Sequence, residues 1–96
     1  MNQKLRSPQT DKLAEAFLSL KTKDEMYSFF EDICTVAELK AMSQRFEVAG
    51  MLTDGVPYSD IVEKTGVSTA TISRVNRALN YGADGYKTAL KRIGDQ

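Results

Sequence analysis

The stretch that decides the fold is residues 57–76, PYSDIVEKTGVSTATISRVN, which predicts a short helix, a glycine turn and a second helix. We expect the first helix to begin at Ile61 and the chain to turn at Gly66, because glycine tolerates the positive φ that ends many helices. Val67 should follow as a buried turn residue. Ser68 should cap the second helix by accepting a hydrogen bond from its free backbone N–H groups.

The second of these helices has two different sides. Ile72 and Val75 should point back at the first helix, and the remaining side chains are mostly short and polar: Thr69, Ala70, Thr71, Ser73, Arg74 and Arg77. An ordinary helical hairpin is the alternative interpretation, but its surface would favour Glu, Lys, Gln or Ala over several Thr and Ser. The pattern therefore predicts a helix that enters a DNA major groove, where hydroxyls and methyls meet base edges and arginines meet phosphates or guanine.

The rest of the chain also carries helix signals. Ser7 and Pro8 form a start signal, and two pairs follow the capping-box pattern, Thr22 with Glu25 and Thr35 with Glu38. Apolar residues recur at helical spacing in four segments: Leu13, Ala16, Phe17 and Leu20; Met26, Phe29, Phe30 and Ile33; Val36, Leu39, Met42, Phe46 and Ala49; and Tyr86, Ala89, Leu90 and Ile93. Breaks are expected at Asp54-Gly55 and near Asn80-Tyr81-Gly82, and the tail should fray after Gly94.

These signals predict an all-α chain of about six helices in one domain. Residues 13–56 and 83–94 would form the core and the dimerisation surface, and residues 57–81 would form the DNA-reading part. The helices at 22–33 and 35–53 are joined almost directly, which leaves little loop for a compact antiparallel hairpin. Their apolar stripes need another surface to cover them, and we expect that surface to come from a second copy in an intertwined homodimer.

The charges are balanced in total but not along the chain. Lys and Arg number 13, as do Asp and Glu. Acidic residues dominate 24–40, whereas residues 74–92 carry Arg74, Arg77, Lys87, Lys91 and Arg92 against a single Asp84, and Lys4, Arg6 and Lys12 form a basic N-terminal cluster. Because phosphate attraction depends on the local field, this polarity is compatible with DNA binding, although a solvated helix face would give similar counts.

Composition argues against several other classes of protein. No apolar run is long enough for a membrane span or a signal peptide, and the single Cys34 cannot form an intrachain disulfide, so a cytoplasmic location is expected. Histidine is absent, so neither a metal site nor a cofactor is predicted. No paired carboxylates, glycine-rich phosphate loop or activated nucleophile indicate an enzyme. Tyr81, Tyr86 and Asn80 are expected to cap and pack between the last two helices.

Two longer blocks carry a family resemblance. FFEDICTVAELKAMSQRFEVAGML lies ahead of TGVSTATISRVNRALNYG, and the Gly85-Tyr86 pair follows both. In this order they resemble the Trp repressor family, and within it the YerC/YecD group, over roughly residues 13–93. The resemblance implies an intertwined helical dimer that binds operator DNA across two adjacent major grooves. By position it implies base contacts from Thr69, Ala70 and Ser73, with Thr71 near the backbone or a flanking base. Ser68, Arg74, Arg77 and Lys91 complete the predicted double-stranded DNA contacts.

The resemblance also implies a co-repressor pocket, and here the sequence departs from the tryptophan-binding pattern. Arg45 and Arg74 match the two arginines that flank the ligand, and Thr35 matches a residue that closes its carboxylate and amino end. Val75, however, stands where the tryptophan-binding protein has glycine, and Ala78 stands where it has a serine. The resemblance thus predicts an effector pocket of these five residues in which two lining positions are apolar or filled.

Each of these residues also has a simpler role. Val75 would fill the core position that helix-turn-helix proteins commonly give to an aliphatic residue. Arg45 would pair with Glu38 or with the acidic residues near Asp54, and Arg74 would contact phosphate. We therefore predict a transcriptional repressor that binds a two-fold operator as a homodimer without L-tryptophan. The alternatives are a repressor controlled by an unidentified small-molecule effector and a helix-turn-helix module for protein interaction within a larger assembly. The exposed hydroxyls and arginines speak against the interaction module, because protein interfaces favour buried aromatics at their centre.

Overall fold

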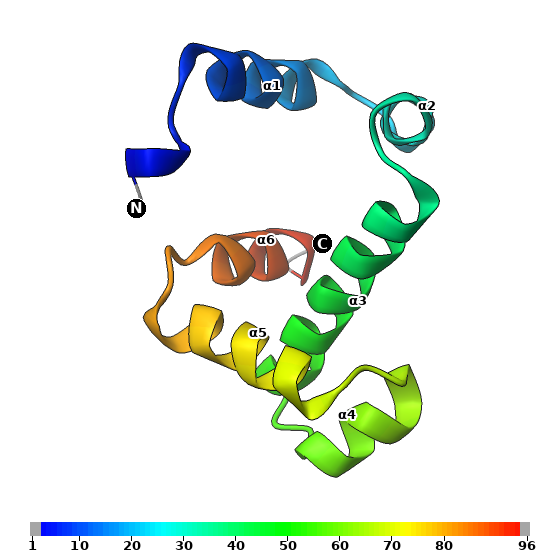
Figure 1. Cartoon of the computed structure of the whole chain (residues 1–96), viewed down its shortest axis with the longest axis vertical. Coiled ribbons are helices and arrows are strands. Elements are labelled where there is room, and N and C mark those ends of the chain that lie inside the picture. Colours follow the sequence, from blue (N-terminus) through cyan, green and yellow to red (C-terminus); the bar gives the residue numbers. More distant parts are fainter. Residues whose placement is uncertain (1–2, 95–96) are drawn as a thin grey trace. The chain divides into compact units, whose positions relative to one another are not determined.

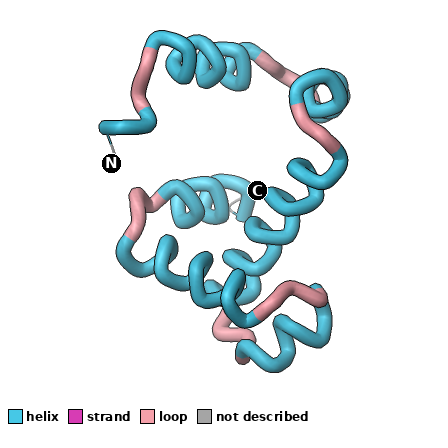
Figure 2. Tube along the Cα trace, in the orientation of Figure 1, coloured by secondary structure: helices cyan, strands magenta, loops and turns pink. Residues whose placement is uncertain are grey.

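The computed structural model describes residues 3–94, which form helices joined by short loops and no strand (Figures 1 and 2). A short 3-10 helix, η1 (Gln3–Leu5), precedes six α-helices: α1 (Pro8–Ser19), α2 (Lys23–Ile33), α3 (Val36–Thr53), α4 (Tyr58–Thr65), α5 (Thr69–Tyr81) and α6 (Gly85–Gly94). The all-α prediction of about six helices is confirmed. The expected fraying after Gly94 concerns residues 95–96, which lie outside the described part.

The helix starts follow the predicted caps. The backbone N–H of Thr10 donates to Ser7 Oγ at 3.0 Å, with Pro8 at the first helical position. At the start of α3 the exchange is reciprocal, because Thr35 N–H donates to Glu38 Oε1 at 2.8 Å and Glu38 N–H donates to Thr35 Oγ1 at 3.1 Å. These bonds satisfy N–H groups that would otherwise lack a partner within the helix.

The predicted capping box of α2 forms with one difference. Glu25 N–H donates to Thr22 Oγ1 at 3.1 Å as expected. The Glu25 carboxylate, however, accepts from the N–H of Lys21 at 2.7 Å, one residue earlier than the pattern indicates. The side chain therefore fixes the connection from α1 into α2 as well as the helix itself.

The chain divides into two compact units, residues 1–39 and 40–96, with the boundary inside α3. In the described part of the first unit no side chain is buried. Its best-packed feature is an aromatic cluster, in which the Phe17 ring lies 5.2 Å from Phe29 and 6.4 Å from Phe30, and Tyr27 lies 6.3 Å from Phe30. The cluster joins α1 to α2 without enclosing a core.

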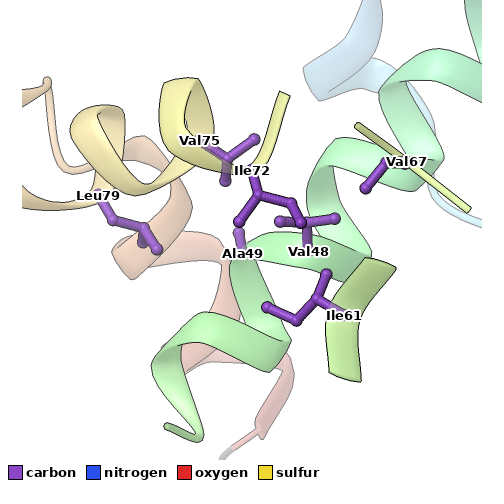
Figure 3. Close-up of a cluster of buried hydrophobic side chains, with 7 residues drawn as sticks. All are labelled: Val48, Ala49, Ile61, Val67, Ile72, Val75 and Leu79. Atoms are coloured by element: carbon purple, nitrogen blue, oxygen red, sulfur yellow. The ribbon is translucent and has the colours of Figure 1, made fainter. Parts of the chain in front are cut away.

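The second unit has a core of its own. Its buried side chains come from the C-terminal half of α3, from α4 and α5, and from the turn between α4 and α5 (Figure 3): Val48, Ala49, Ile61, Val67, Ile72, Val75 and Leu79. Tyr86 and Leu90 of α6 pack against this cluster, and the Phe46 and Tyr86 rings lie 6.4 Å apart. The helix-turn-helix of α4 and α5 therefore packs against α3 and α6 and shares one core with them.

Two details differ from the sequence predictions. The helix α4 begins at Tyr58, directly after Pro57, and not at Ile61, because the Pro57 carbonyl already accepts the first helical hydrogen bond, from the Ile61 N–H at 3.1 Å. Tyr81 does not pack between the last two helices, since its side chain is 86% exposed. Val36, expected on the apolar stripe of α3, is 86% exposed, which is consistent with the prediction that a single chain does not cover this stripe.

Candidate nucleic-acid interface

The turn between α4 and α5 is set by two adjacent residues. Gly66 adopts φ 74° and ψ 3°, the left-handed conformation expected there, and its N–H donates to the Val62 carbonyl at 2.8 Å. Thr65 adds a contact that the sequence reasoning missed. Its hydroxyl donates to the Ile61 carbonyl at 2.6 Å and accepts from the Val67 N–H at 3.2 Å. One side chain thus links the last turn of α4 to the residue that enters the core.

Ser68 caps α5 as predicted. The Thr71 N–H donates to Ser68 Oγ at 3.2 Å, and the two hydroxyl oxygens lie 3.1 Å apart. Both hydroxyl oxygens therefore take part in bonds at the start of the helix, and Thr71 is half-buried. This geometry favours a positioning role for Ser68 and Thr71, and leaves the neighbouring side chains to project outward.

Apolar contacts fix the rotation of α5 about its axis. Ile72 is fully buried, Val75 is 1% exposed and Leu79 is 6% exposed. Figure 3 shows Ile72 and Val75 directed at Val48 and Ala49 of α3. Burial of each such side chain contributes about 1.5–3 kcal/mol, so turning the helix away from this arrangement would be costly.

The opposite side of α5 is exposed, polar and basic. It presents Thr69, Ala70, Ser73, Arg74 and Arg77 to solvent. The first turn of α5 has no acidic residue, so the positive end of the helix dipole is not neutralised from within the helix. Neither arginine forms an ion pair with another described residue. Small hydroxyl and methyl groups near the helix start, flanked by guanidinium groups, suit the edges of bases and the phosphates beside them.

The remaining predicted DNA contact lies elsewhere. Lys91 is on α6, exposed, and lines a cavity that it shares with residues of α3 and α5. The structure therefore brings seven of the eight predicted DNA-binding residues together at the start and outer side of α5 and places Lys91 on a neighbouring helix. A phosphate contact from Lys91 stays a prediction.

The five predicted effector residues have different surroundings in the two units. In the second unit Val75 belongs to the core beside Ala49, Ala78 and Arg45 are half-buried, and Arg74 is exposed. Arg45 forms no ion pair with a described residue, so the expected pairing with acidic neighbours is absent from the described part. In the first unit both polar groups of Thr35 are used in the α3 capping box. Val75 occupies with its own side chain the position that glycine would leave open.

Comparison with known proteins identifies the family. The family profile described as Trp repressor protein matches residues 8–94. The chain belongs to the Trp repressor family. Within the family it is 52% identical over 90 residues to the uncharacterized protein YerC of Bacillus subtilis, covering 94% of this chain and 86% of YerC. It is 31% identical over 75 residues to the Trp operon repressor homolog of Chlamydia caviae, covering 77% and 74% of the two chains.

Solved structures of the Trp repressor family have the same fold. A TrpR-like protein from Eubacterium eligens is 58% identical, with a TM-score of 0.92 over 97% of this chain and 96% of that one. A Staphylococcus aureus protein is 44% identical, with a TM-score of 0.93 over 100% and 97% of the two chains. The predicted resemblance to the Trp repressor family and its YerC group is confirmed. In the described residues no helix has the length and apolar character needed to cross a membrane.

Proposed function

We propose that this chain is a sequence-specific DNA-binding transcriptional regulator and that two copies form a homodimer on a two-fold symmetric operator. The observation that carries the proposal is the outer side of α5. Its hydroxyls and arginines are exposed, while Ile72, Val75 and Leu79 anchor the other side in the core. A helix held this rigidly presents its outer side chains in one fixed array, which base recognition requires.

The roles within that array follow from side-chain chemistry. Thr69, Ala70 and Ser73 would contact base edges, with Ser68 and Thr71 holding the helix start in position. Arg74 and Arg77 would contact phosphates or guanine, since a guanidinium group binds either in a bidentate manner. The name of the Chlamydia caviae relative, a Trp operon repressor homolog, supports repression as the sign of regulation.

Dimerisation is supported by the first unit. Leu18 is 85% exposed, Ile33 is 45% exposed, and no described side chain of this unit is buried. Two helices with uncovered apolar stripes gain little from folding alone, because apolar burial is the main favourable term. A second copy supplies the missing surface and also supplies the second reading helix that a two-fold operator needs.

The regulator would bind its operator without L-tryptophan. Val75 fills its own site in the core, and Ala78 offers no hydroxyl to a ligand amino group. The reading helix is therefore held by a residue of the chain in place of a bound effector.

Selection of bound duplexes from a random pool by the full chain, with and without L-tryptophan, tests this function. We expect a two-fold symmetric motif in both cases. The double variant Thr69→Val with Ser73→Ala should change the selected bases, whereas Thr88→Ala, an exposed hydroxyl on α6, should not. Absence of enrichment would contradict DNA recognition, and a motif without symmetry would contradict the dimer.

A further inference from the structure

A cavity lies beside the C-terminal half of α5. Its lining includes Lys91, the predicted phosphate contact, and residues of the segments 13–56 and 83–94 that are predicted to form the core and the dimerisation surface. It is open, has a volume of about 640 Å³, and lies in the second unit between the C-terminal end of α3, the C-terminal half of α5 and the length of α6. On α5 it is lined by Asn76, Leu79 and Asn80, which belong neither to the predicted base contacts nor to the predicted effector pocket. Its volume falls within the range of about 300–1,000 Å³ that is usual for small-molecule sites.

The floor of the cavity is apolar. Leu79 is 6% exposed, and Leu52 and Leu90 are half-buried and pack against the core. Gly50 lies beside them in the lining, and a methyl group there would make an ordinary van der Waals contact with Leu90 Cδ2 at 3.6 Å. An apolar ligand group placed on these leucines would be removed from water at no cost in hydrogen bonding.

The rim carries polar groups that include more positive than negative charge. Lys87 and Lys91 lie one helical turn apart on α6, and Asp54 is the single lining carboxylate. The Lys87 ammonium group lies 4.0 Å from Asp84 Oδ1 in an exposed ion pair, and such pairs contribute little stability. Lys91 forms no ion pair with a described residue, so its ammonium group is available to a ligand.

The two asparagines of the rim are partly satisfied by each other. Asn80 Nδ2 donates to Asn76 Oδ1 at 3.3 Å. This bond uses the Asn76 oxygen and leaves the Asn76 amide N–H groups as donors beside the cavity. Donors therefore come from both α5 and α6.

We propose that this cavity binds a small amphipathic carboxylate, with its apolar body on the leucine floor and its carboxylate between Lys91 and the Asn76 amide. A free phosphate would leave the leucines uncovered, and an amphipathic amine would face two ammonium groups across the rim. A ligand held in this way joins α5 to α6. Its influence on DNA affinity rests on the proposed function, whereas its binding does not.

The test uses the full chain in solution without DNA and octanoate as the probe, followed by amide chemical shifts. We expect saturable shifts in α5 and α6 at millimolar octanoate, with octylamine and inorganic phosphate giving much weaker responses. Lys91→Gln should weaken octanoate binding about tenfold, the effect of losing one charge-assisted hydrogen bond. Asp54→Asn should strengthen it several-fold, because a like charge is removed from the rim.

The matched control is Lys64→Gln, the same charge change at an exposed lysine on α4 that does not line the cavity, and it should leave octanoate binding unchanged. Chemical shifts that do not saturate with octanoate would overturn the proposal. This outcome is also expected if a second copy of the chain fills the cavity. Equal binding of octylamine or phosphate would overturn the carboxylate assignment, and so would equal responses of the Lys91 and Lys64 variants. Because no DNA is present, these failures are distinct from a failure of operator selection.

Discussion

At the scale of single residues, Val75 connects the core to the proposed DNA-reading side of α5. It lies on α5 one residue after Arg74, yet it is 1% exposed and packs with Ile72 and Ala49. Successive side chains of a helix point in fixed directions relative to one another. The packing of Val75 in the core therefore sets the directions of Arg74 and the other exposed side chains of α5. A glycine in its place would remove that constraint.

Replacement of Val75 by glycine should therefore weaken unliganded operator binding. The variant loses about 2 kcal/mol of apolar burial and about 1 kcal/mol of helix preference, which loosens α5. Calorimetry with L-tryptophan should show no appreciable binding to the unchanged chain. Tryptophan affinity in the micromolar range, or operator binding that requires tryptophan, would show that the pocket is functional. Unchanged operator affinity of the glycine variant would show that Val75 does not hold the reading helix.

Arg77 should act through phosphates. Its guanidinium group is exposed and forms no ion pair with a described residue, so it is available to the DNA backbone. For Arg77→Ala we expect the slope of log affinity against log salt to become shallower by about one for each phosphate that the variant no longer neutralises, with the selected bases unchanged. Lys91→Ala should behave in the same way if it reaches a phosphate. An altered base preference with an intact slope would assign Arg77 to base recognition.

At the scale of helices, local sequence accounts for most boundaries. The caps at Ser7, Thr22, Thr35 and Ser68 could all be predicted because each bond joins residues three apart in sequence. The positive φ of Gly66 could also be predicted, because it depends only on the residue type and on its place at the end of a helix. The sequence did not reveal the exposure of Tyr81 or the cavity between α3, α5 and α6. Both depend on how helices distant in sequence pack together.

The candidate interface shows the same division. The outward set on α5 followed from helical periodicity once Ile72 and Val75 were assigned to the core. The two bonds of the Thr65 hydroxyl could have been anticipated from a threonine placed directly before the turn glycine, since such hydroxyls often bond to a carbonyl four residues earlier. The position of Lys91 beside the cavity could not, because it depends on how α6 packs on α5.

The α3 capping box gives a pH-dependent contribution to stability. Hydrogen bonds from the backbone and the hydroxyl of Thr35 lower the pKa of Glu38 below its ordinary value of 4.5. A lowered folded-state pKa means that the contribution is present above pH 4.5 and is lost as the pH falls through the lower, folded value. Glu38→Gln should therefore be less stable than the unchanged chain near neutral pH, with a difference that shrinks in acid. Unfolding by urea at several pH values measures it.

Glu15→Gln is the control for this measurement, because Glu15 is an exposed helical carboxylate without a capping bond. Its effect on the free energy of unfolding should be small at every pH. An acid-independent difference for Glu38→Gln would show that the carboxylate charge does not contribute to the cap.

At the scale of the whole molecule, the contrast between the two units predicts assembly. We expect sedimentation at micromolar concentration to give a dimer, because the first unit has apolar helices without a core of its own. Phe46→Ala should lower the free energy of unfolding by about 3–5 kcal/mol if the half-buried ring is completed by a second copy. Tyr81→Ala, at a side chain that is 86% exposed, should change it by less than about 0.5 kcal/mol.

A folded monomer at micromolar concentration would contradict the intertwined arrangement. A negligible effect of Phe46→Ala would place that ring outside any shared core. Sedimentation and the unfolding of Phe46→Ala both test assembly without DNA. Their result is therefore independent of operator recognition.

The absence of a core in the described part of the first unit also has a consequence in time. The second unit has a core that one chain supplies, and such packing takes about a second or less in small domains. In the proposed homodimer the first unit would have to wait for an encounter with another chain, so its completion would be second order and would slow as the protein becomes dilute. After refolding is started, the appearance of operator binding should therefore lag behind the burial of Ile72 and Val75, and the lag should lengthen as protein concentration falls. A regulator of this kind becomes active at a rate set by its own abundance.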